Sequence, residues 1–181
     1  MADYKMVDVE EQPYLYNERS CSMEPDDISR NMEIAFRTVG ELVGKESIAS
    51  VSKALSVYYT HDPQTMTFRA GFLVSAEDAR KAEGKVKADV LPAGEVLNFI
   101  HRGSYAKLRV SYGNMMEYLE KNGMTVGAPT WEVYLNDPDS VASEDELETD
   151  IYVTVERADR PGRRSRDYGR LMKSNTAESE G

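Results

Sequence analysis

The chain has 181 residues, a single cysteine and a formal net charge of −10 at pH 7. This length suits one domain, or two small units sharing a core, and Cys21 alone excludes an intrachain disulfide. No apolar run approaches the roughly 18 residues of a membrane-spanning helix, and an acidic chain repels the phosphate backbone of nucleic acids. Because residues 1–5 also lack the apolar stretch of a signal peptide, we expect a cytoplasmic protein without direct DNA binding.

The first half predicts a β-α-β-β order. Residues 4–16 read as a strand, and the polar residues 20–26 read as a turn. A helix is predicted from Asp26 or Asp27 to Gly44, because an aspartate can cap its first turn and apolar residues recur at helical spacing. Strands over 53–59 and 65–74 follow. The helical spacing is carried by Ile28, Met32, Ala35, Val39 and Leu42.

The second half predicts the same order. A charged stretch over 77–87 can hold a short helix, and a strand is predicted over 94–101. Ser104 is a suitable N-cap for a helix that ends at Asn122-Gly123. Strands over 130–135 and 148–155 complete the unit. One face of this helix carries Tyr105, Leu108, Tyr112, Met115 or Met116, and Leu119.

A short internal repeat supports a duplication. Val57-Tyr58 precedes Asp62-Pro63, and Val133-Tyr134 precedes Asp137-Pro138. A half-repeat of this kind indicates a duplicated unit. We therefore expect an α+β fold of two β-α-β-β repeats related by a pseudo-two-fold axis, with an antiparallel sheet and helices packed on it. The domain is predicted over 1–156, with repeats at about 4–74 and 86–155.

The end of the chain, 157–181, predicts a mobile charged tail. From Glu156 onward there are seven basic and five acidic residues, among Pro, Gly and Ser. Short charged ends are mostly solvated, although a basic tail can also contact an acidic partner.

The two copies differ at one informative place, because Trp131-Glu132 stands where the first copy has Leu55-Ser56. Side chains alternate along a strand, so Glu132 shares a face with Tyr134 while Trp131 takes the other face. One interpretation is a solvated strand face. The other is a site, because Tyr58 repeats the position of Tyr134 in the first copy.

Aromatic rings around one carboxylate can hold a flat or lipophilic cation through charge and ring faces together. Tyr152 either belongs to the same group of rings around Glu132 or lies on an exposed strand face. We expect a small-molecule ligand, aromatic or cationic. The candidate ligand-binding residues are Glu132, Tyr134, Trp131, Tyr105, Tyr152 and Tyr58.

No metal or cofactor is predicted. His61, His101 and Cys21 lie far apart and match no ligand spacing. Residues 40–45 superficially look like a phosphate loop, but they sit at a helix C-terminus, where the helix dipole disfavours phosphate.

The second half resembles the gyrase-inhibitor-like (GyrI-like) family, the effector-binding domain of bacterial multidrug-responsive regulators, here expected to stand alone without a DNA-binding segment. The matching stretches are 101–105 (HRGSY), 131–134 (WEVY), 136–138 (NDP) and 148–155 (ETDIYVTV). The resemblance implies a ligand cleft between two halves, with Glu132 as the glutamate of the pocket and Tyr105, Tyr134 and Tyr152 near its aromatic positions.

The sequence leaves three functions open. The one we expect is a cytoplasmic sensor or sequestration protein for small molecules, favouring lipophilic or aromatic cations, and the other two are alternatives. The resemblance also implies a hydrolase of cyclopropane-containing electrophiles, with Glu132 as the catalytic acid or base. The third is an inhibitor or modulator of a protein partner.

Overall fold

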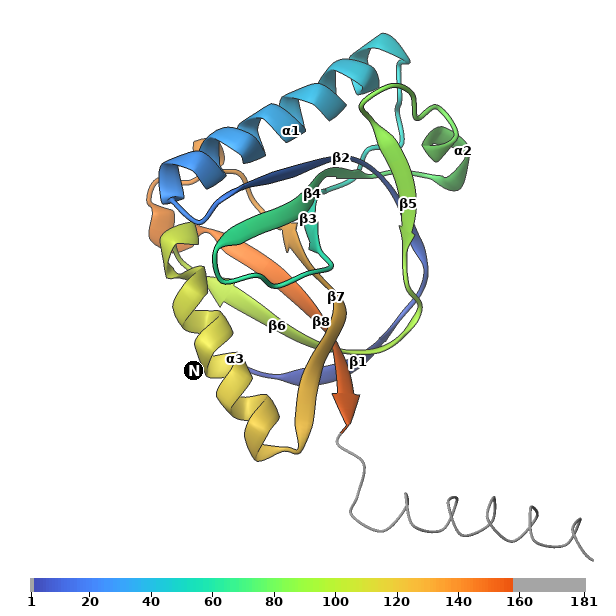
Figure 1. Cartoon of the computed structure of the whole chain (residues 1–181). Coiled ribbons are helices and arrows are strands. Elements are labelled where there is room, and N and C mark those ends of the chain that lie inside the picture. The colour runs from blue at the N-terminus through green and yellow to red at the C-terminus, as the bar shows by residue number, and fades with distance from the viewer. Residues whose placement is uncertain (1, 158–181) are drawn as a thin grey trace, which may run out of the picture.

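The computed structural model describes residues 2–157 and has a mixed α+β fold. Eight strands, all paired antiparallel, form one curled sheet, and the two long helices lie along the outside of it (Figure 1). The fold class predicted from the sequence is confirmed. The elements are β1 (Lys5–Val9), β2 (Gln12–Ser22), α1 (Pro25–Lys45), β3 (Ala54–Tyr58), β4 (Thr65–Leu73), α2 (Ala76–Ala79), β5 (Lys87–Leu91), β6 (Gly94–Arg102), η1 (Tyr105–Lys107), α3 (Leu108–Lys121), β7 (Met124–Tyr134), η2 (Pro138–Ser140), η3 (Glu144–Glu146) and β8 (Glu148–Arg157).

The strand order β1-β6-β8-β7-β3-β4-β2-β5 is symmetric about its centre. On one side stand β7, β8, β6 and β1, and on the other stand the corresponding strands β3, β4, β2 and β5. The β-α-β-β order therefore recurs as β2-α1-β3-β4 and β6-α3-β7-β8. The central pair, β3 with β7, joins the two units across the pseudo-two-fold axis.

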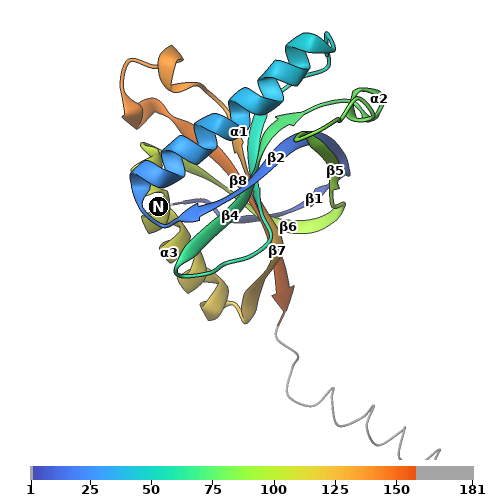
Figure 2. The same cartoon turned by 45° about the horizontal axis from the view of Figure 1, so that its top comes forward.

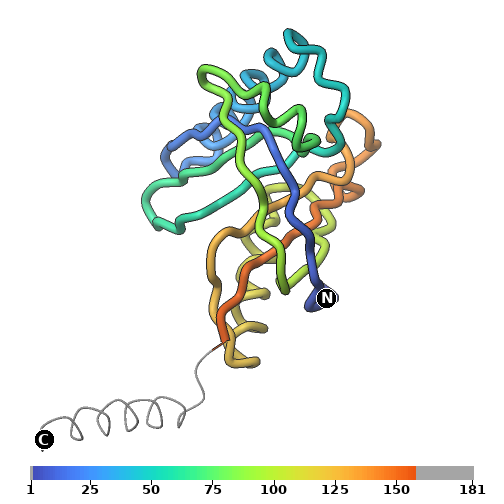
Figure 3. The backbone as a smooth tube through the Cα atoms, turned by 90° about the vertical axis from the view of Figure 1, so that its right-hand side faces the viewer, coloured from blue at the N-terminus to red at the C-terminus, as the bar shows by residue number. Residues whose placement is uncertain are grey.

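Each unit also has one strand that the sequence analysis did not separate. The predicted strand over 4–16 is divided into β1 and β2, and β5 precedes β6 in the second unit. These additional strands are exchanged between the units, because β1 pairs with β6 and β5 pairs with β2. Figure 3 shows the blue and green segments running beside one another as a result. Strand exchange of this kind depends on tertiary pairing, which local patterns do not report.

Three predicted boundaries are wrong. Ser20–Ser22 is not a turn but the end of β2, where the Ser20 and Thr67 hydroxyls lie 2.7 Å apart across the strands. Ser104 caps no helix through its side chain, since a 3-10 turn intervenes before α3. β7 begins at Met124 rather than at residue 130, and its pairing with β8 shifts register between Val126 and Thr130. Polar composition and a proline are typical of loops, but here cross-strand pairing maintains a strand.

The predicted tail begins one residue too early, because Arg157 is the last residue of β8. The remainder, 158–181, lies outside the described residues. No helix within the described range is long and apolar enough to cross a membrane.

The sheet has two differently covered faces. The side chains of Trp131, Val57 and Leu55 belong to a buried cluster on one face, together with residues of the curled ends of the sheet. The other face is covered by the long helices. There, α1 packs on β2 and β4, and α3 packs on a cluster that includes Phe99 and Ile151. Figure 2 shows α1 in front of the sheet and α3 at its lower left, so the centre of the sheet lies between two separate helices.

Alanine substitutions at two glycines test this packing. Gly71 in β4 lies so close to the Leu15 backbone that an added Cβ would overlap the carbonyl oxygen, whereas Gly113 on the surface of α3 has open space around it. Gly71→Ala should therefore cost about 4 kcal/mol or more of unfolding free energy. Gly113→Ala should instead stabilise the protein by up to about 1 kcal/mol, because alanine is the better helix former. Urea unfolding of both variants checks this, and a Gly71→Ala protein as stable as the parent would contradict the β2–β4 packing.

Candidate functional site

Glu132 lies at the centre of the sheet, on the face between the two helices. The register of the central pair places Glu132 of β7 directly opposite Ser56 of β3. These are the two positions that the sequence repeat makes equivalent, and Tyr58 and Tyr134 follow each of them by two residues. The pseudo-two-fold axis thus passes between Ser56 and Glu132, where one repeat has a hydroxyl group and the other a carboxylate.

Three tyrosine hydroxyl groups surround the Glu132 carboxylate, which is only 3% exposed. Tyr112 of α3 donates to Oε2 at 2.7 Å, and Tyr134 donates to Oε1 at 3.0 Å. Tyr58 approaches Oε1 at 3.4 Å from the other repeat. The carboxylate is therefore buried with hydrogen-bond donors, which a buried charged group requires.

The helices contribute equivalent aromatic residues to the site. Phe36 of α1 and Tyr112 of α3 are separated by the same number of residues as Ser56 and Glu132, so they occupy matching places in the two units. The ring of Tyr134 meets Phe36 edge-on at 6.3 Å and Tyr105 at 5.6 Å between centroids. Tyr58, Tyr112 and Tyr134 are half-buried, while Tyr105 is 39% exposed. The hydroxyl groups of the first three lie within 3.4 Å of the carboxylate oxygens.

Burial raises the pKa of Glu132 above its ordinary value of 4.5, because the charged form is poorly solvated. The hydrogen bonds from Tyr112, Tyr134 and Tyr58, and the nearby His101, act in the opposite direction. Burial and then the Glu132 charge raise the pKa of the three tyrosines, which stay protonated and able to donate. Among the residues that the structure describes, no basic side chain forms an ion pair with Glu132.

A chain of polar contacts continues from the carboxylate into the first repeat. The Tyr134 hydroxyl lies 2.9 Å from Ser56 Oγ, which lies 3.6 Å from Met32 Sδ on α1. A phenol has one proton, so while Tyr134 donates to an ionised Glu132 its oxygen can accept from Ser56. The network thus links both helices to the central strands through one acidic group.

The structure brings together four of the predicted site residues, namely Glu132, Tyr134, Tyr58 and Tyr105. It places Trp131 and Tyr152 on the opposite face, where their rings stack at 5.3 Å. The prediction that Tyr152 joins the wall around Glu132 is wrong, because the register pairs Tyr152 with Trp131 while Ile151 is opposite Glu132. Paired residues of neighbouring strands share a face.

Sequence reasoning missed the contribution of Tyr112, Phe36, Ser56 and Met32. Helical spacing puts Tyr112 on the inward face of its helix, where a phenol needs a hydrogen-bond partner, and that requirement is the pattern that could have identified it. The hydroxyl and thioether groups become site residues only through the pairing of β3 with β7.

An open groove of about 570 Å³ lies away from Glu132. It is bounded by the C-terminal half of α1, including Leu42 and Lys45, and by residues 83–86. None of its lining residues belongs to the tyrosine cluster, and the phenol-lined carboxylate is the better candidate site on chemical grounds.

The family model described as "GyrI-like small molecule binding domain" matches residues 2–156. The chain belongs to this GyrI-like family. No curated protein matched the sequence.

Solved structures share the GyrI-like fold at low sequence identity. The EcmrR C-terminal domain is 19% identical with a TM-score of 0.74, over 87% of this chain and 99% of that one. In the EcmrR–DNA complex the corresponding TM-score is 0.68, and this chain spans only 58% of the length of that chain.

Two further structures carry functional descriptions. A hydrolase encoded by lin2189 from Listeria innocua is 15% identical, with a TM-score of 0.55 over 84% of this chain and 91% of that one. SAV2435, solved bound to tetraphenylphosphonium, is 12% identical, with a TM-score of 0.56 over 85% and 94% of the two chains. At these identities the likeness establishes the fold alone.

The raised pKa of Glu132 gives a prediction for stability. Between the ordinary and the raised pKa the folded protein binds more protons than the unfolded chain. The parent therefore loses stability as pH rises through this window, by about 1.4 kcal/mol for each pH unit that the window spans. The glutamine side chain of the Glu132→Gln variant cannot ionise, so the variant does not lose this unfolding free energy as pH rises. The unfolding free energy of the variant minus that of the parent should therefore increase from below pH 4.5 toward neutral pH.

Denaturant unfolding at a series of pH values measures this difference. Glu120→Gln, on an exposed position of α3, is the matched control and should track the parent. A difference that grows as pH falls would show that burial does not raise the pKa of Glu132.

Proposed function

We propose that this protein binds lipophilic aromatic cations at Glu132 and serves as a cytoplasmic sensor or sequestration protein for them. The observation that carries the proposal is a buried carboxylate held by three phenol donors, with no basic partner in the described part of the chain. A desolvated charge lacking a counter-ion attracts a cation that can itself leave water cheaply. Lipophilic cations have this property, whereas small hydrated ions do not.

The aromatic residues around Glu132 contribute to cation binding in addition to the carboxylate. Aromatic rings beside a carboxylate can offer their negative faces to a cation, and Tyr105 is the exposed one among them. SAV2435, which has the same fold, was solved with tetraphenylphosphonium, a cation of this class. The acidic composition of the chain, with a net charge of −10, favours encounter with cations in general.

Glu132→Gln tests the charge while keeping the shape of the side chain. Tetraphenylphosphonium should bind the variant at least about tenfold more weakly than the parent, a loss of about 1.4 kcal/mol. Neutral triphenylphosphine oxide should bind both proteins alike, because it lacks the net charge. Isothermal titration measures both ligands, with Glu120→Gln as the control for loss of an exposed carboxylate. Equal affinity of parent and Glu132→Gln for tetraphenylphosphonium would contradict the proposal.

A hydrolase is the second candidate, favoured by the raised pKa of Glu132 and by the fold shared with the Listeria innocua hydrolase. A carboxyl group whose pKa is raised toward neutrality can donate or accept a proton at working pH. In the opening of a cyclopropane electrophile, water adds across the broken C–C bond, with its hydroxyl on one carbon and a proton on the other. Glu132 would move that proton, and a tyrosine hydroxyl would orient the substrate.

Mass spectrometry of ring opening distinguishes the two candidates. If the protein is an enzyme, Glu132→Gln should reduce turnover of a cyclopropane-bearing electrophile by about 10²–10⁴-fold. Tyr112→Phe should reduce it less, because it removes one donor only. Turnover that survives in Glu132→Gln would remove this residue from the chemistry. Tight binding of the electrophile by the parent without turnover would favour the sensor or sequestration function.

A further inference from the structure

His101 is a buried polar residue near the site that the proposed function does not use. It lies in β6, only 4% exposed, and both ring nitrogens have partners. Nε2 lies 2.9 Å from the carbonyl oxygen of Ser104, and Nδ1 lies 2.6 Å from the hydroxyl of Ser111 in α3. A carbonyl oxygen can only accept, so Nε2 carries a proton. Nδ1 and the Ser111 hydroxyl share the second hydrogen bond, which either group can donate.

The two partners of His101 each immediately precede an aromatic residue of the site. Ser104 is followed by Tyr105, whose ring packs edge-on against Tyr134. Ser111 is followed by Tyr112, which donates to Glu132 at 2.7 Å. One imidazole thereby fastens both ends of the segment from residue 104 to residue 112 to β6. This segment passes from a 3-10 turn into α3, and no side-chain cap supports either start.

The first repeat has a different connection at the matching place. Arg19 of β2 stands where His101 stands in β6, because each pairs with the corresponding residue of the neighbouring strand, Phe68 or Thr149. Arg19 Nε donates to Asn31 of α1 at 2.8 Å. Each long helix is thus tied to its strand by a side-chain contact, but only the second contact adjoins residues that touch Glu132.

We propose that His101 is a positioning residue, which through its contacts with Ser104 and Ser111 holds Tyr105 and Tyr112 in place and thereby sets the hydrogen bond from Tyr112 to Glu132. As far as ligand affinity is concerned, this inference rests on the proposed function. The geometry of the Tyr112–Glu132 contact does not depend on any ligand.

A double-mutant cycle on Ser111 and Tyr112 tests the inference without removing the imidazole. The readout is the pKa of the Glu132 carboxyl group, measured by carbon-detected NMR. Tyr112→Phe removes a donor to the carboxylate and should raise that pKa. Ser111→Ala should raise it by a smaller amount in the parent and leave it unchanged when Tyr112 is already phenylalanine.

If His101 only stabilises the fold, the Ser111→Ala variant should behave differently. Ser111→Ala would then lower the unfolding free energy without changing the Glu132 pKa, or would change this pKa equally in both backgrounds, and either result overturns the inference. Ser20→Ala, which removes a serine hydroxyl contact in β2 remote from Glu132, is the control and should leave the pKa unchanged. Nitrogen NMR of the His101 ring should show a protonated Nε2, and an unprotonated Nε2 also overturns the inference.

Ligand affinity gives an independent readout. Ser111→Ala should weaken tetraphenylphosphonium binding by about fivefold, the scale of one hydrogen bond. If the parent does not bind tetraphenylphosphonium, the proposed function fails, while the pKa cycle still decides the role of His101. If the parent binds and Ser111→Ala binds equally well while the Glu132 pKa is unmoved, the inference fails and the proposed function stands.

Discussion

The burial of one carboxylate at the centre of the sheet is the constraint on which the site depends. A charged group removed from water must find donors or a counter-ion, and Glu132 has three phenol donors and no basic partner in the described range. Those donors come from three places in the chain, namely β3, β7 and α3. The central strand pair and one helix must therefore be assembled before the carboxylate is satisfied, which couples the site to the junction of the two units.

The internal symmetry explains why the site is where it is. In a duplicated fold the junction of the units is the place where equivalent residues face one another, and Ser56 faces Glu132 there. The same equivalence relates Tyr58 to Tyr134 and Phe36 to Tyr112. Each of these two pairs preserves an aromatic ring, and only the second pair differs by a hydroxyl group. The result is an aromatic cluster of approximately two-fold arrangement with a single carboxyl group beside its axis.

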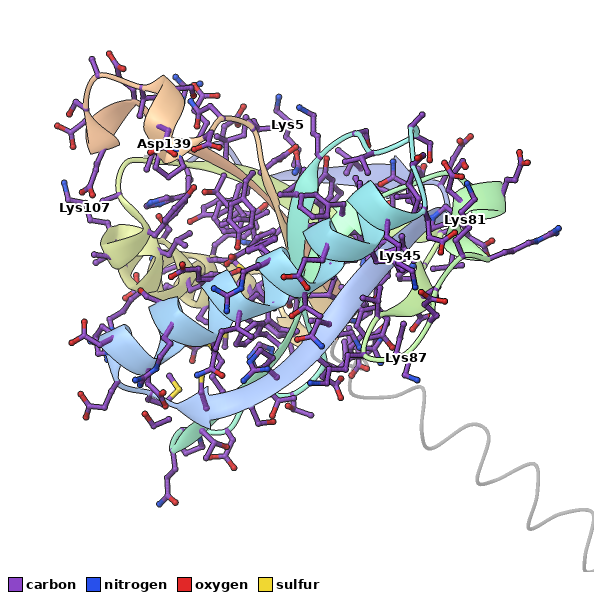
Figure 4. The ribbon with its side chains drawn as sticks, turned by 90° about the horizontal axis from the view of Figure 1, so that it is seen from above. Lys5, Lys45, Lys81, Lys87, Lys107 and Asp139 are labelled. Atoms are coloured by element: carbon purple, nitrogen blue, oxygen red, sulfur yellow. The ribbon has the colours of Figure 1, made fainter. Side chains whose placement is uncertain are left out.

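The region around Tyr105 combines exposure with charge. Proximity of the acidic Asp137 and Glu132 adds to the effect of burial in raising the pKa of Tyr105. Figure 4 shows Asp139, of the acidic segment that follows β7, at the same end of the molecule as Lys107, and away from Lys45 and Lys81. The end of the sheet next to Tyr105 therefore carries acidic groups together with Lys107, which pairs with Asp145 at 3.8 Å.

The sequence by itself determined the fold class and the position of the acidic group. Helical spacing from Ile28 to Leu42 and the repeated Val-Tyr and Asp-Pro pairs predicted two β-α-β-β units, because periodicity and turn residues are local properties. Alternation along one strand correctly put Glu132 and Tyr134 on one face and Trp131 on the other. The tertiary structure alone decided which strands are neighbours. It exchanged β1 and β5 between the units, placed Tyr152 on the face of Trp131, and brought Tyr112 and Ser56 to Glu132. Register between strands distant in sequence is fixed by the packing of the whole sheet, and no single segment encodes it.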